Sequence, residues 1–394
     1  MKTLQQLNFT NERAVIRVDF NVPLNDQLEV TDPTRIEAAK PTITHILSQG
    51  GSCVLLSHLG RPKGNDPKLS LNNIAAKVSE ILGVPVQFSS QCVGAAAEEK
   101  ANTLKPGEVL LMENLRFHPE ETAGDIGFSK QLAQLGTVYV NDAFGTAHRA
   151  HASTTIIAQF FENKKCFGSL LEKEVKAIEK VMKDGASPVL AILGGAKVSS
   201  KITIIESLME KVDHLIIGGG MVYTFTKALG GKVGNSICEP DYCDYALELL
   251  EKAKQKGVTI HLPVDVVAGD AFSNDANRKQ FDVMDIPDGW EGMDAGPKST
   301  ARFKELIVTC KTILWNGPMG VFEFSNFAEG TIAVGNAIGE ATKKGAFSLV
   351  GGGDSVAAVK QFDMQDKMSY ISTGGGAMLE SLEGKRLPGI AALS

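Results

Sequence analysis

The segment VLAILGGAKVSSK (residues 189–201) decides the fold of this chain. Five apolar residues, Val189–Leu193, run directly into Gly194-Gly195 and then into a polar stretch. A short continuous apolar run is typical of a strand buried on both faces, as in a parallel sheet. Glycines at its carboxyl end leave backbone N–H groups uncovered. The segment therefore predicts a buried parallel strand that ends in a turn suited to an anion.

The same pattern recurs along the chain: a short apolar run, a turn, then apolar residues spaced as on one face of a helix. Further apolar runs are Ala14–Phe20, Cys53–Leu56, Val109–Met112, Val138–Val140, His214–Ile217, Val258–Pro263, Thr312–Trp315, Phe347–Val350 and Met368–Ile371. Helix candidates include Ile74–Leu82, Lys201–Val212 and Thr331–Lys343. Strands and helices that alternate in this way predict an α/β fold with parallel sheets and right-handed crossovers.

Length and composition indicate a globular protein of about two domains. The chain has 394 residues and a net charge of −6, and a domain usually takes roughly 100–200 residues. The negative net charge predicts that the protein binds neither nucleic acid nor a membrane surface. No apolar stretch approaches ~18 residues, and the first nine residues lack a secretory pattern. Six scattered cysteines without a Cys-x-x-Cys pair indicate a reducing compartment, so we expect a cytoplasmic protein.

The boundary between the two halves is predicted to be a helix at 169–185. Leu170, Leu171, Val175 and Ile178 repeat at three- and four-residue spacing, and Asp184-Gly185 supplies a stop signal. A helix of this length is a fairly stiff connector. The alternative is one more crossover helix within a single domain.

Four glycine pairs or triplets closely follow apolar runs in the second half. They are Gly194-Gly195, Gly218–Gly220, Gly351–Gly353 and Gly374–Gly376. One such turn is most simply a tight bend, but four can converge on one crevice at the carboxyl ends of parallel strands. Neither a P-loop pattern nor the Gly-x-Gly-x-x-Gly dinucleotide fingerprint is present. We therefore expect a phosphate site of another kind.

Charged residues beside these turns have both a plain and a functional interpretation. Lys197 and Lys201 are four residues apart, so on a helix they share one face near its positive end. Two lysines on one face repel each other, and a bound polyanion would offset this repulsion. The alternative is that they are two solvated lysines. Asp354 follows Gly353 and is either a helix N-cap or a carboxylate for Mg²⁺ beside phosphates.

Arginines follow the strands of the first half. Arg35, Arg61, Arg116 and Arg149 each come shortly after a different predicted strand. Because parallel strands end at one edge, these guanidinium groups gather there and repel one another unless an anion of more than one charge holds them. The alternative is ordinary surface arginines. The set favours a small phosphorylated acid as ligand.

These segments make the chain resemble the phosphoglycerate kinase family over essentially its whole length. The motifs that carry the resemblance are Arg17–Pro23 with Arg35, Ser57–Pro62, Glu113–Phe117, Asn141–Ser153, Gly194–Lys201, Gly218–Gly220, Trp315–Glu323, Gly351–Ser355 and Ser372–Gly376. The resemblance implies two doubly wound parallel-sheet domains facing a cleft and joined by a helix. The expected boundaries are 1–168, 169–185 for the helix, 186–376, and 377–394 for a tail that returns to the first domain.

The resemblance also implies the substrates and their positions. The first domain would bind 3-phosphoglycerate or 1,3-bisphosphoglycerate through Asp19, Phe20, Asn21, Arg35, His58, Leu59, Gly60, Arg61, Arg116 and Arg149. The second would bind Mg-ADP or Mg-ATP through Lys197, Lys201, Gly219, Gly292, Asn316, Glu323, Gly351, Gly352, Gly353, Asp354 and Ser355, with Asp354 as the metal contact. Ser200 and Glu37 depart from the usual family pattern, but neither is an expected contact position.

The chemistry follows from these charges. A carboxylate acceptor is already ionised at pH 7, so no general base is needed. Catalysis then consists of in-line positioning and charge stabilisation, for which Arg35, Lys197, Lys201 and the backbone at Gly352 and Gly375 are the candidates. An oxidoreductase and a non-catalytic phosphate-binding module are the rival interpretations. We expect a monomer, because a two-domain chain can complete the site unaided.

Overall fold

The computed structural model describes residues 2–394 and divides into two compact units. The first comprises the chain up to Lys176 together with Arg386–Ser394, and the second runs from Ala177 to Lys385. The division falls inside helix α6 (Ser169–Met182). The chain rejoins the first unit at Arg386, whereas the sequence analysis placed the start of this return at residue 377.

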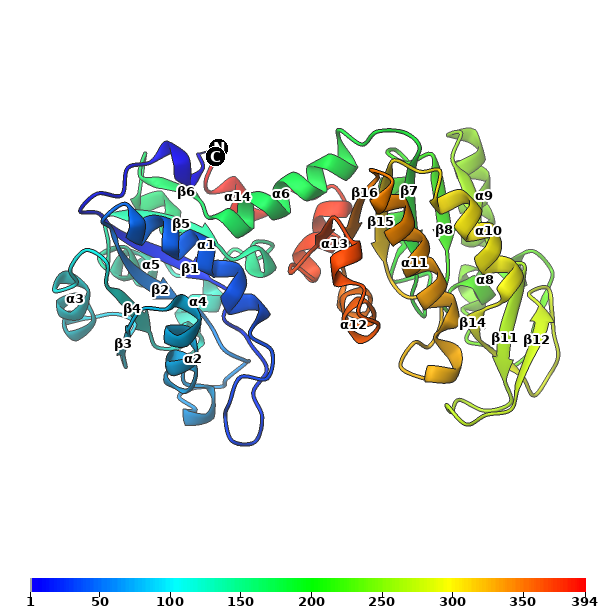
Figure 1. Cartoon of the computed structure of the whole chain (residues 1–394), viewed down its shortest axis with the longest axis horizontal. Helices are drawn as coiled ribbons and strands as arrows, with labels where there is room; N and C mark the ends of the chain where they lie inside the picture. Colours follow the sequence, from blue (N-terminus) through cyan, green and yellow to red (C-terminus); the bar gives the residue numbers. More distant parts are fainter. Residues whose placement is uncertain (1) are drawn as a thin grey trace. The chain divides into compact units, whose positions relative to one another are not determined.

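The first unit is built on a six-stranded sheet in the order β3-β4-β2-β1-β5-β6, with every pairing parallel (Figure 1). The strands are β1 (Arg13–Val18), β2 (Ser52–Leu56), β3 (Val86–Ser89), β4 (Val109–Met112), β5 (Val138–Asp142) and β6 (Lys165–Phe167). From the central β1 the chain moves out to β2 and later returns to β1's other side as β5. Ligands bind at such a switch point, outside the carboxyl ends of the strands.

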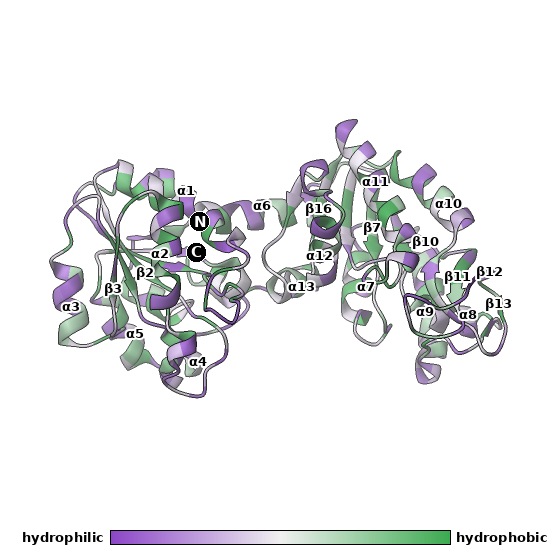
Figure 2. Ribbon diagram, turned by 60° about the horizontal axis from the view of Figure 1, so that its bottom comes forward, coloured by the Kyte–Doolittle hydropathy of each residue, from purple (hydrophilic) through white to green (hydrophobic). Residues whose placement is uncertain are grey.

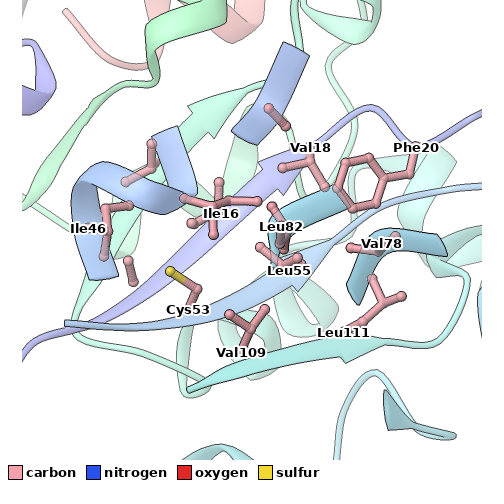
Figure 3. Packing of buried hydrophobic residues seen from close by; sticks show 14 of the residues in the cluster. Ile16, Val18, Phe20, Ile46, Cys53, Leu55, Val78, Leu82, Val109 and Leu111 are labelled. Carbon is pink, nitrogen blue, oxygen red and sulfur yellow. The ribbon is translucent and has the colours of Figure 1, made fainter. Parts of the chain in front are cut away.

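Helices cover this sheet, and its core is nearly all aliphatic. Figure 3 shows Ile16 and Val18 of β1 and Leu55 of β2 in one cluster with Ile46 of α1 and Val78 of α2. The alternate strand residues are buried as well, so the sheet is covered on both faces. The helices are α1 (Thr34–Ser48), α2 (Asn72–Leu82), α3 (Ala95–Asn102), α4 (Pro119–Ala123), α5 (Ile126–Ala133) and α14 (Pro388–Ala391).

The second unit has its own six-stranded parallel sheet, in the order β10-β8-β7-β15-β16-β17. The strands are β7 (Val189–Leu193), β8 (His214–Ile217), β10 (Thr259–His261), β15 (Thr312–Asn316), β16 (Phe347–Val350) and β17 (Tyr370–Ile371). Here the chain reverses direction across the sheet between β7 and β15. The glycines that follow these two strands therefore lie at the switch point.

The second unit also contains seven helices and two small sheets. The helices are α7 (Ile202–Leu208), α8 (Val222–Ala228), α9 (Cys243–Gln255), α10 (Pro297–Ile307), α11 (Glu329–Lys343), α12 (Gly353–Gln361) and α13 (Gly376–Leu382). The small sheets join β12 (Arg278–Asp282), β11 (Asp265–Gly269) and β14 (Glu291–Ala295), and β13 (Asp285–Ile286) with β9 (Lys232–Val233). Neither small sheet was predicted from the sequence.

Hydropathy follows the layers within each unit: the strands are mainly apolar, and polar residues lie on the outer turns of the helices (Figure 2). All six cysteines are free thiols, and four of them are buried. Among residues 2–394, no helix combines the length and apolarity that a membrane crossing requires.

The amino end of α6 is anchored to the first sheet by one buried carboxylate. Asp142 Oδ1 accepts hydrogen bonds from the backbone N–H of Leu170 (2.8 Å) and Leu171 (3.2 Å). Gly168 lies so close that a Cβ there would be 2.1 Å from this oxygen. Thr42 Oγ1 accepts the N–H of Ser169 at 2.8 Å. The first turn of α6 is therefore capped by residues of the first unit.

Candidate functional site

In the first unit, the segments that follow β2, β4 and β5 line a cavity of about 610 Å³. Arg61, Arg116 and Arg149 all line it, although they come from different loops. His151 and Lys63 complete its polar wall. None of the described residues that line it carries a carboxylate. Three guanidinium groups that line one cavity favour an anionic ligand, because the ligand relieves their mutual repulsion.

Hydrogen bonds between the loops fix this edge of the sheet. Asn21 Oδ1 accepts the N–H of Gly60 at 2.8 Å, and Arg116 Nη1 donates to the carbonyl of Gly60 at 2.7 Å. Arg35 Nη1 lies 2.8 Å from Asp19 Oδ2. These contacts join loops that follow β1, β2 and β4, so the side chains around the cavity are held before any ligand arrives.

Burial and neighbouring positive charges keep His58 and His151 of the first unit neutral. Burial, followed by the charges of Arg17 and Arg116, lowers the pKa of His58 well below its usual value. Burial and the same two arginines lower the pKa of His151 to about 4. Burial and neighbouring cations also lower the pKa of Arg116. The positive charge of this site therefore comes from guanidinium groups rather than from imidazolium.

Two expected contact residues have core side chains. Phe20 is fully buried and Leu59 nearly so, and both belong to the hydrophobic cluster beneath α1 and α2. The backbone N–H of Phe20 donates to Ser57 Oγ, and that of Leu59 donates to Asn114 Oδ1. Their part is to shape the loops.

In the second unit, a cavity of about 440 Å³ lies among the glycine turns. Four expected residues line it: Gly219, Gly292, Glu323 and Asp354. Much of the remaining wall is apolar, a feature that the sequence analysis missed. The apolar lining residues include Tyr223, Ile237, Phe272, Met293, Met319 and Val321. An apolar pocket beside open backbone amides suits a ligand with a flat ring system and an anionic tail.

The glycines of this site permit close backbone approach at the switch point. A Cβ on Gly194 would lie 1.9 Å from the carbonyl oxygen of Pro318, and one on Gly219 would lie 2.7 Å from the nitrogen of Gly195. Gly352 has a φ of +94° and precedes α12. Only glycine fits these positions without displacing backbone.

Lys201, Asn316 and Gly351 form a hydrogen-bonded chain beside the cavity. Lys201 Nζ donates to Asn316 Oδ1, and Asn316 Nδ2 donates to the carbonyl of Gly351 at 2.7 Å. Burial lowers the pKa of Lys201, and the charge of Asp354 opposes this shift. Ser355 Oγ accepts the N–H of Gly317 at 2.5 Å. The turns after β7, β15 and β16 are thus joined.

The expectation that Lys197 and Lys201 share a helix face is wrong. Helix α7 begins at Ile202 with Lys201 as its N-cap, so Lys197 lies in an exposed loop. Ser199 holds this loop: its N–H and hydroxyl both donate to the carboxylate of Glu239, at 3.0 and 2.6 Å. Neither Lys197 nor Gly375 lines the cavity described above.

Comparison with known proteins agrees with this architecture. Residues 4–385 match the family model for phosphoglycerate kinase. A phosphoglycerate kinase from Porphyromonas gingivalis is 54% identical over 415 aligned positions, which cover 99% of each chain. The structure of phosphoglycerate kinase from Coxiella burnetii superposes with a TM-score of 0.91 at 39% identity, covering 100% of this chain and 98% of that one. For phosphoglycerate kinase from Pyrococcus horikoshii the TM-score is 0.84, at 32% identity and the same coverage.

The fold and these relatives define a phosphotransferase with a carboxyl group as acceptor. More particularly, the chain belongs to the phosphoglycerate kinase family. The reaction is the reversible glycolytic transfer of a phosphoryl group between 1,3-bisphosphoglycerate and ADP, which gives 3-phosphoglycerate and ATP. ATP and ADP are therefore substrates.

Proposed function

We propose that the cavity of the first unit binds the phosphoglycerate and that the cavity of the second unit binds the nucleotide. The observation that carries this assignment is the convergence of Arg61, Arg116 and Arg149 on one cavity of about 610 Å³. Guanidinium groups bind phosphate and carboxylate oxygens in a bidentate manner. A small molecule with a phosphate at one end and a carboxylate at the other satisfies several of them together.

The nucleotide assignment is supported by the second cavity. Tyr223, Phe272 and Met319 offer apolar surface to a base. Gly195 and Gly219 line the same cavity and present backbone without side chains. Nucleotide phosphates would lie toward the first turn of α12, where N–H groups and the positive helix end favour anions.

Asp354 is the proposed contact for Mg²⁺. It lies in the first turn of α12 and lines the nucleotide cavity. One carboxylate next to a phosphate-binding turn suits Mg²⁺, which protein sites commonly hold through one or two carboxylates together with substrate phosphates. When bound, Mg²⁺ neutralises charge on the phosphate oxygens.

Catalysis by this chain is proposed to consist of positioning and charge stabilisation. Arg35 and Lys201 supply positive charge, and Gly352 and Gly375 supply backbone N–H groups for the transferred phosphoryl group. Lys197 is retained as a candidate, with its side chain exposed in a loop. The attacking carboxylate of 3-phosphoglycerate is ionised at pH 7, so no residue needs to remove a proton.

The test is ATP consumption by the whole chain, measured with and without 3-phosphoglycerate and Mg²⁺. We expect consumption only when both are present. Consumption without 3-phosphoglycerate would contradict the proposal, and so would binding without turnover, as expected of a phosphate-binding module. An oxidoreductase would instead change nicotinamide absorbance.

We also propose a cytoplasmic monomer that does not bind nucleic acid. The net charge of −6 disfavours a polyanionic partner, and a two-domain chain can complete the site unaided. A similar protein from Arabidopsis thaliana is named as cytosolic. Size-exclusion chromatography coupled to light scattering measures the mass of the protein in solution. The mass of a dimer would contradict the proposal.

A further inference from the structure

A buried polar chain in the first unit links four residues that come from separate segments. Arg17 Nε donates to Ser153 Oγ at 2.7 Å, and Ser153 Oγ donates to Glu121 Oε1 at 2.6 Å. The N–H of Ser153 donates to Glu121 Oε2 at 3.0 Å. Arg17 Nη2 lies 3.1 Å from His58 Nδ1. Each of the four residues is at most 3% exposed.

Two opposite charges in this hydrogen-bonded network are joined through the hydroxyl group of Ser153. Arg17 and Glu121 are both buried, and burying an unpaired charge is very costly. Ser153 has one O–H to donate and lone pairs to accept with, so it can serve both partners in the same geometry. Without that hydroxyl, Arg17 loses its Nε partner.

The sheet register holds this serine opposite Arg17. Arg17 of β1 pairs with Asn141 of β5. Asn141 Nδ2 donates to the carbonyl of Thr154 at 3.1 Å, and the Tyr139 hydroxyl donates to the carbonyl of Ser153 at 2.8 Å. Because two residues of β5 form hydrogen bonds with the carbonyl groups of Ser153 and Thr154, Ser153 has little freedom to move.

The contact between Arg17 and His58 fixes which histidine nitrogen carries the proton. A guanidinium group has donors only and keeps its proton in proteins, so Arg17 must donate to His58 Nδ1. Nδ1 is then unprotonated, and the proton of the neutral ring is on Nε2. Among the described residues, Nε2 has no hydrogen-bond partner, which leaves its N–H free for a ligand.

We propose that Glu121, Ser153 and Arg17 are positioning residues that hold His58 as the neutral Nε2–H tautomer, poised to donate a hydrogen bond to the anionic substrate. The role toward substrate rests on the proposed function; the tautomer does not. Glu121, Ser153 and Arg17 reach the substrate only through His58.

The surroundings of His58 agree with a neutral ring. Burial is the largest cause that lowers its pKa, followed by the charges of Arg17, Arg116, Arg35 and His151. These groups face it from β1, from the loops after β4 and β5, and from α1, and Glu121 is the anion that balances Arg17. A neutral donor keeps the same hydrogen bond across the pH range in which a free histidine titrates, near 6.5.

The first experiment determines the tautomer of His58 in the free protein by long-range ¹H–¹⁵N correlation, assigned with the His58→Gln variant. We expect an unprotonated Nδ1 and a protonated Nε2 from pH 6 to pH 8. A proton on Nδ1 in the wild-type protein overturns the proposal, whatever the variants do.

The second experiment compares Ser153→Ala with Ser89→Ala as a matched control. Ser89 is also buried, but its hydroxyl donates to the backbone carbonyl of Gln91 at 2.9 Å, at the end of β3 and outside the network of Arg17, Ser153, Glu121 and His58. In Ser153→Ala we expect a mixture of His58 tautomers and a KM for 3-phosphoglycerate raised about tenfold, the loss of one hydrogen bond. That KM should become pH-dependent near pH 6.5, while kcat stays within about twofold.

The results separate this proposal from the proposed function. Ser153→Thr, which keeps the hydroxyl, should restore both the tautomer and the KM. An unchanged tautomer, or an unchanged KM with a changed tautomer, in Ser153→Ala overturns the positioning role. A wild-type protein with the expected tautomer but no activity dependent on 3-phosphoglycerate would overturn the proposed function instead.

Discussion

Arg35 and Asp19 form an ion pair in which Nη1 lies 2.8 Å from Oδ2, with the aspartate side chain only 9% exposed. The pair joins the first turn of α1 to the segment after β1, and neither residue lines the cavity of Arg61, Arg116 and Arg149. The guanidinium group is 35% exposed, so it can still contact a ligand. Asp19 therefore orients Arg35 without removing it from solvent.

Arg35→Ala should reduce kcat by about 10²–10³-fold, because the variant lacks a preorganised charge that stabilises the transferred group. Arg13→Ala is the matched control: Arg13 begins β1, at the end of the strand remote from Asp19, where its side chain bonds to Leu135 and Asn102. Steady-state kinetics with circular dichroism check the result. Turnover close to that of the wild-type protein would remove Arg35 from its proposed role.

Lys201→Ala should raise the KM for ATP roughly tenfold to a hundredfold, as expected when a charged hydrogen bond to phosphate is lost. The KM for 3-phosphoglycerate should change little, because Lys201 lies beside the nucleotide cavity. Lys211→Ala, an exposed lysine beyond the end of α7, is the control. Equal increases in both KM values would contradict the separate assignment of the two cavities.

Asp354→Asn should increase the Mg²⁺ concentration needed for half-maximal activity by at least about tenfold, since the neutral amide is a weaker magnesium ligand than a carboxylate. Titration of Mg²⁺ at fixed ATP measures this change. Asp366→Asn is a control on the 3-10 helix Gln365–Lys367, which follows α12. An unchanged Mg²⁺ dependence would exclude Asp354 as the contact.

Gly194→Ala should destabilise the second unit by about 3 kcal/mol or more. Its Cβ would lie 1.9 Å from a backbone oxygen of Pro318, and backbone cannot rotate aside as a side chain does. Gly353→Ala is the control, because a Cβ there meets nothing within 4 Å. Thermal unfolding monitored by circular dichroism compares the two. Similar melting temperatures would show that the turn relaxes easily.

Asp142 makes the stability of the first unit depend on pH. Burial raises the pKa of Asp142 from 3.8 to about 6, although its hydrogen bonds act in the opposite direction. Because this folded-state pKa lies above the unfolded value, the contribution of Asp142 to stability is complete below pH 3.8 and is lost as the pH rises through about 6. A shift of about two units corresponds to about 3 kcal/mol.

Asp142→Asn should therefore gain stability relative to the wild-type protein as the pH rises from 4 to 7. The amide oxygen can still accept from Leu170 and Leu171, and it carries no charge to desolvate. Urea unfolding at several pH values measures the difference. A constant difference between the two proteins across this range would show that Asp142 does not titrate in it.

Much of the fold could be predicted because its signals are local. Val189–Leu193 and Cys53–Leu56 are continuous apolar runs, and both form central parallel strands. Strand β12 escaped prediction because its sequence is polar and its residues are largely exposed. The edge strands β3 and β6 were missed because their sequences, VQFS and KCF, contain polar residues and form no continuous apolar run. Short or exposed strands leave little hydrophobic pattern to detect.

The loop at 194–201 shows where local reasoning fails. The spacing of Lys197 and Lys201 suits a helix face, but Val198 is buried and Ser199 bonds to Glu239, forty residues away. Gly194 also packs on the backbone of Pro318. These distant partners hold the segment in a non-helical path, and none of them is visible from within the segment.

The sequence by itself determined the α/β class and the position of the connecting helix, and it predicted the edge of each sheet at which function would lie. It did so because buried strands and glycine turns are encoded by neighbouring residues. Only the tertiary structure decided that Arg61, Arg116 and Arg149 line one cavity, and that Glu121 reaches Arg17 through Ser153. These contacts depend on the strand order and on the pairing of buried charges. Both are properties of the folded chain as a whole.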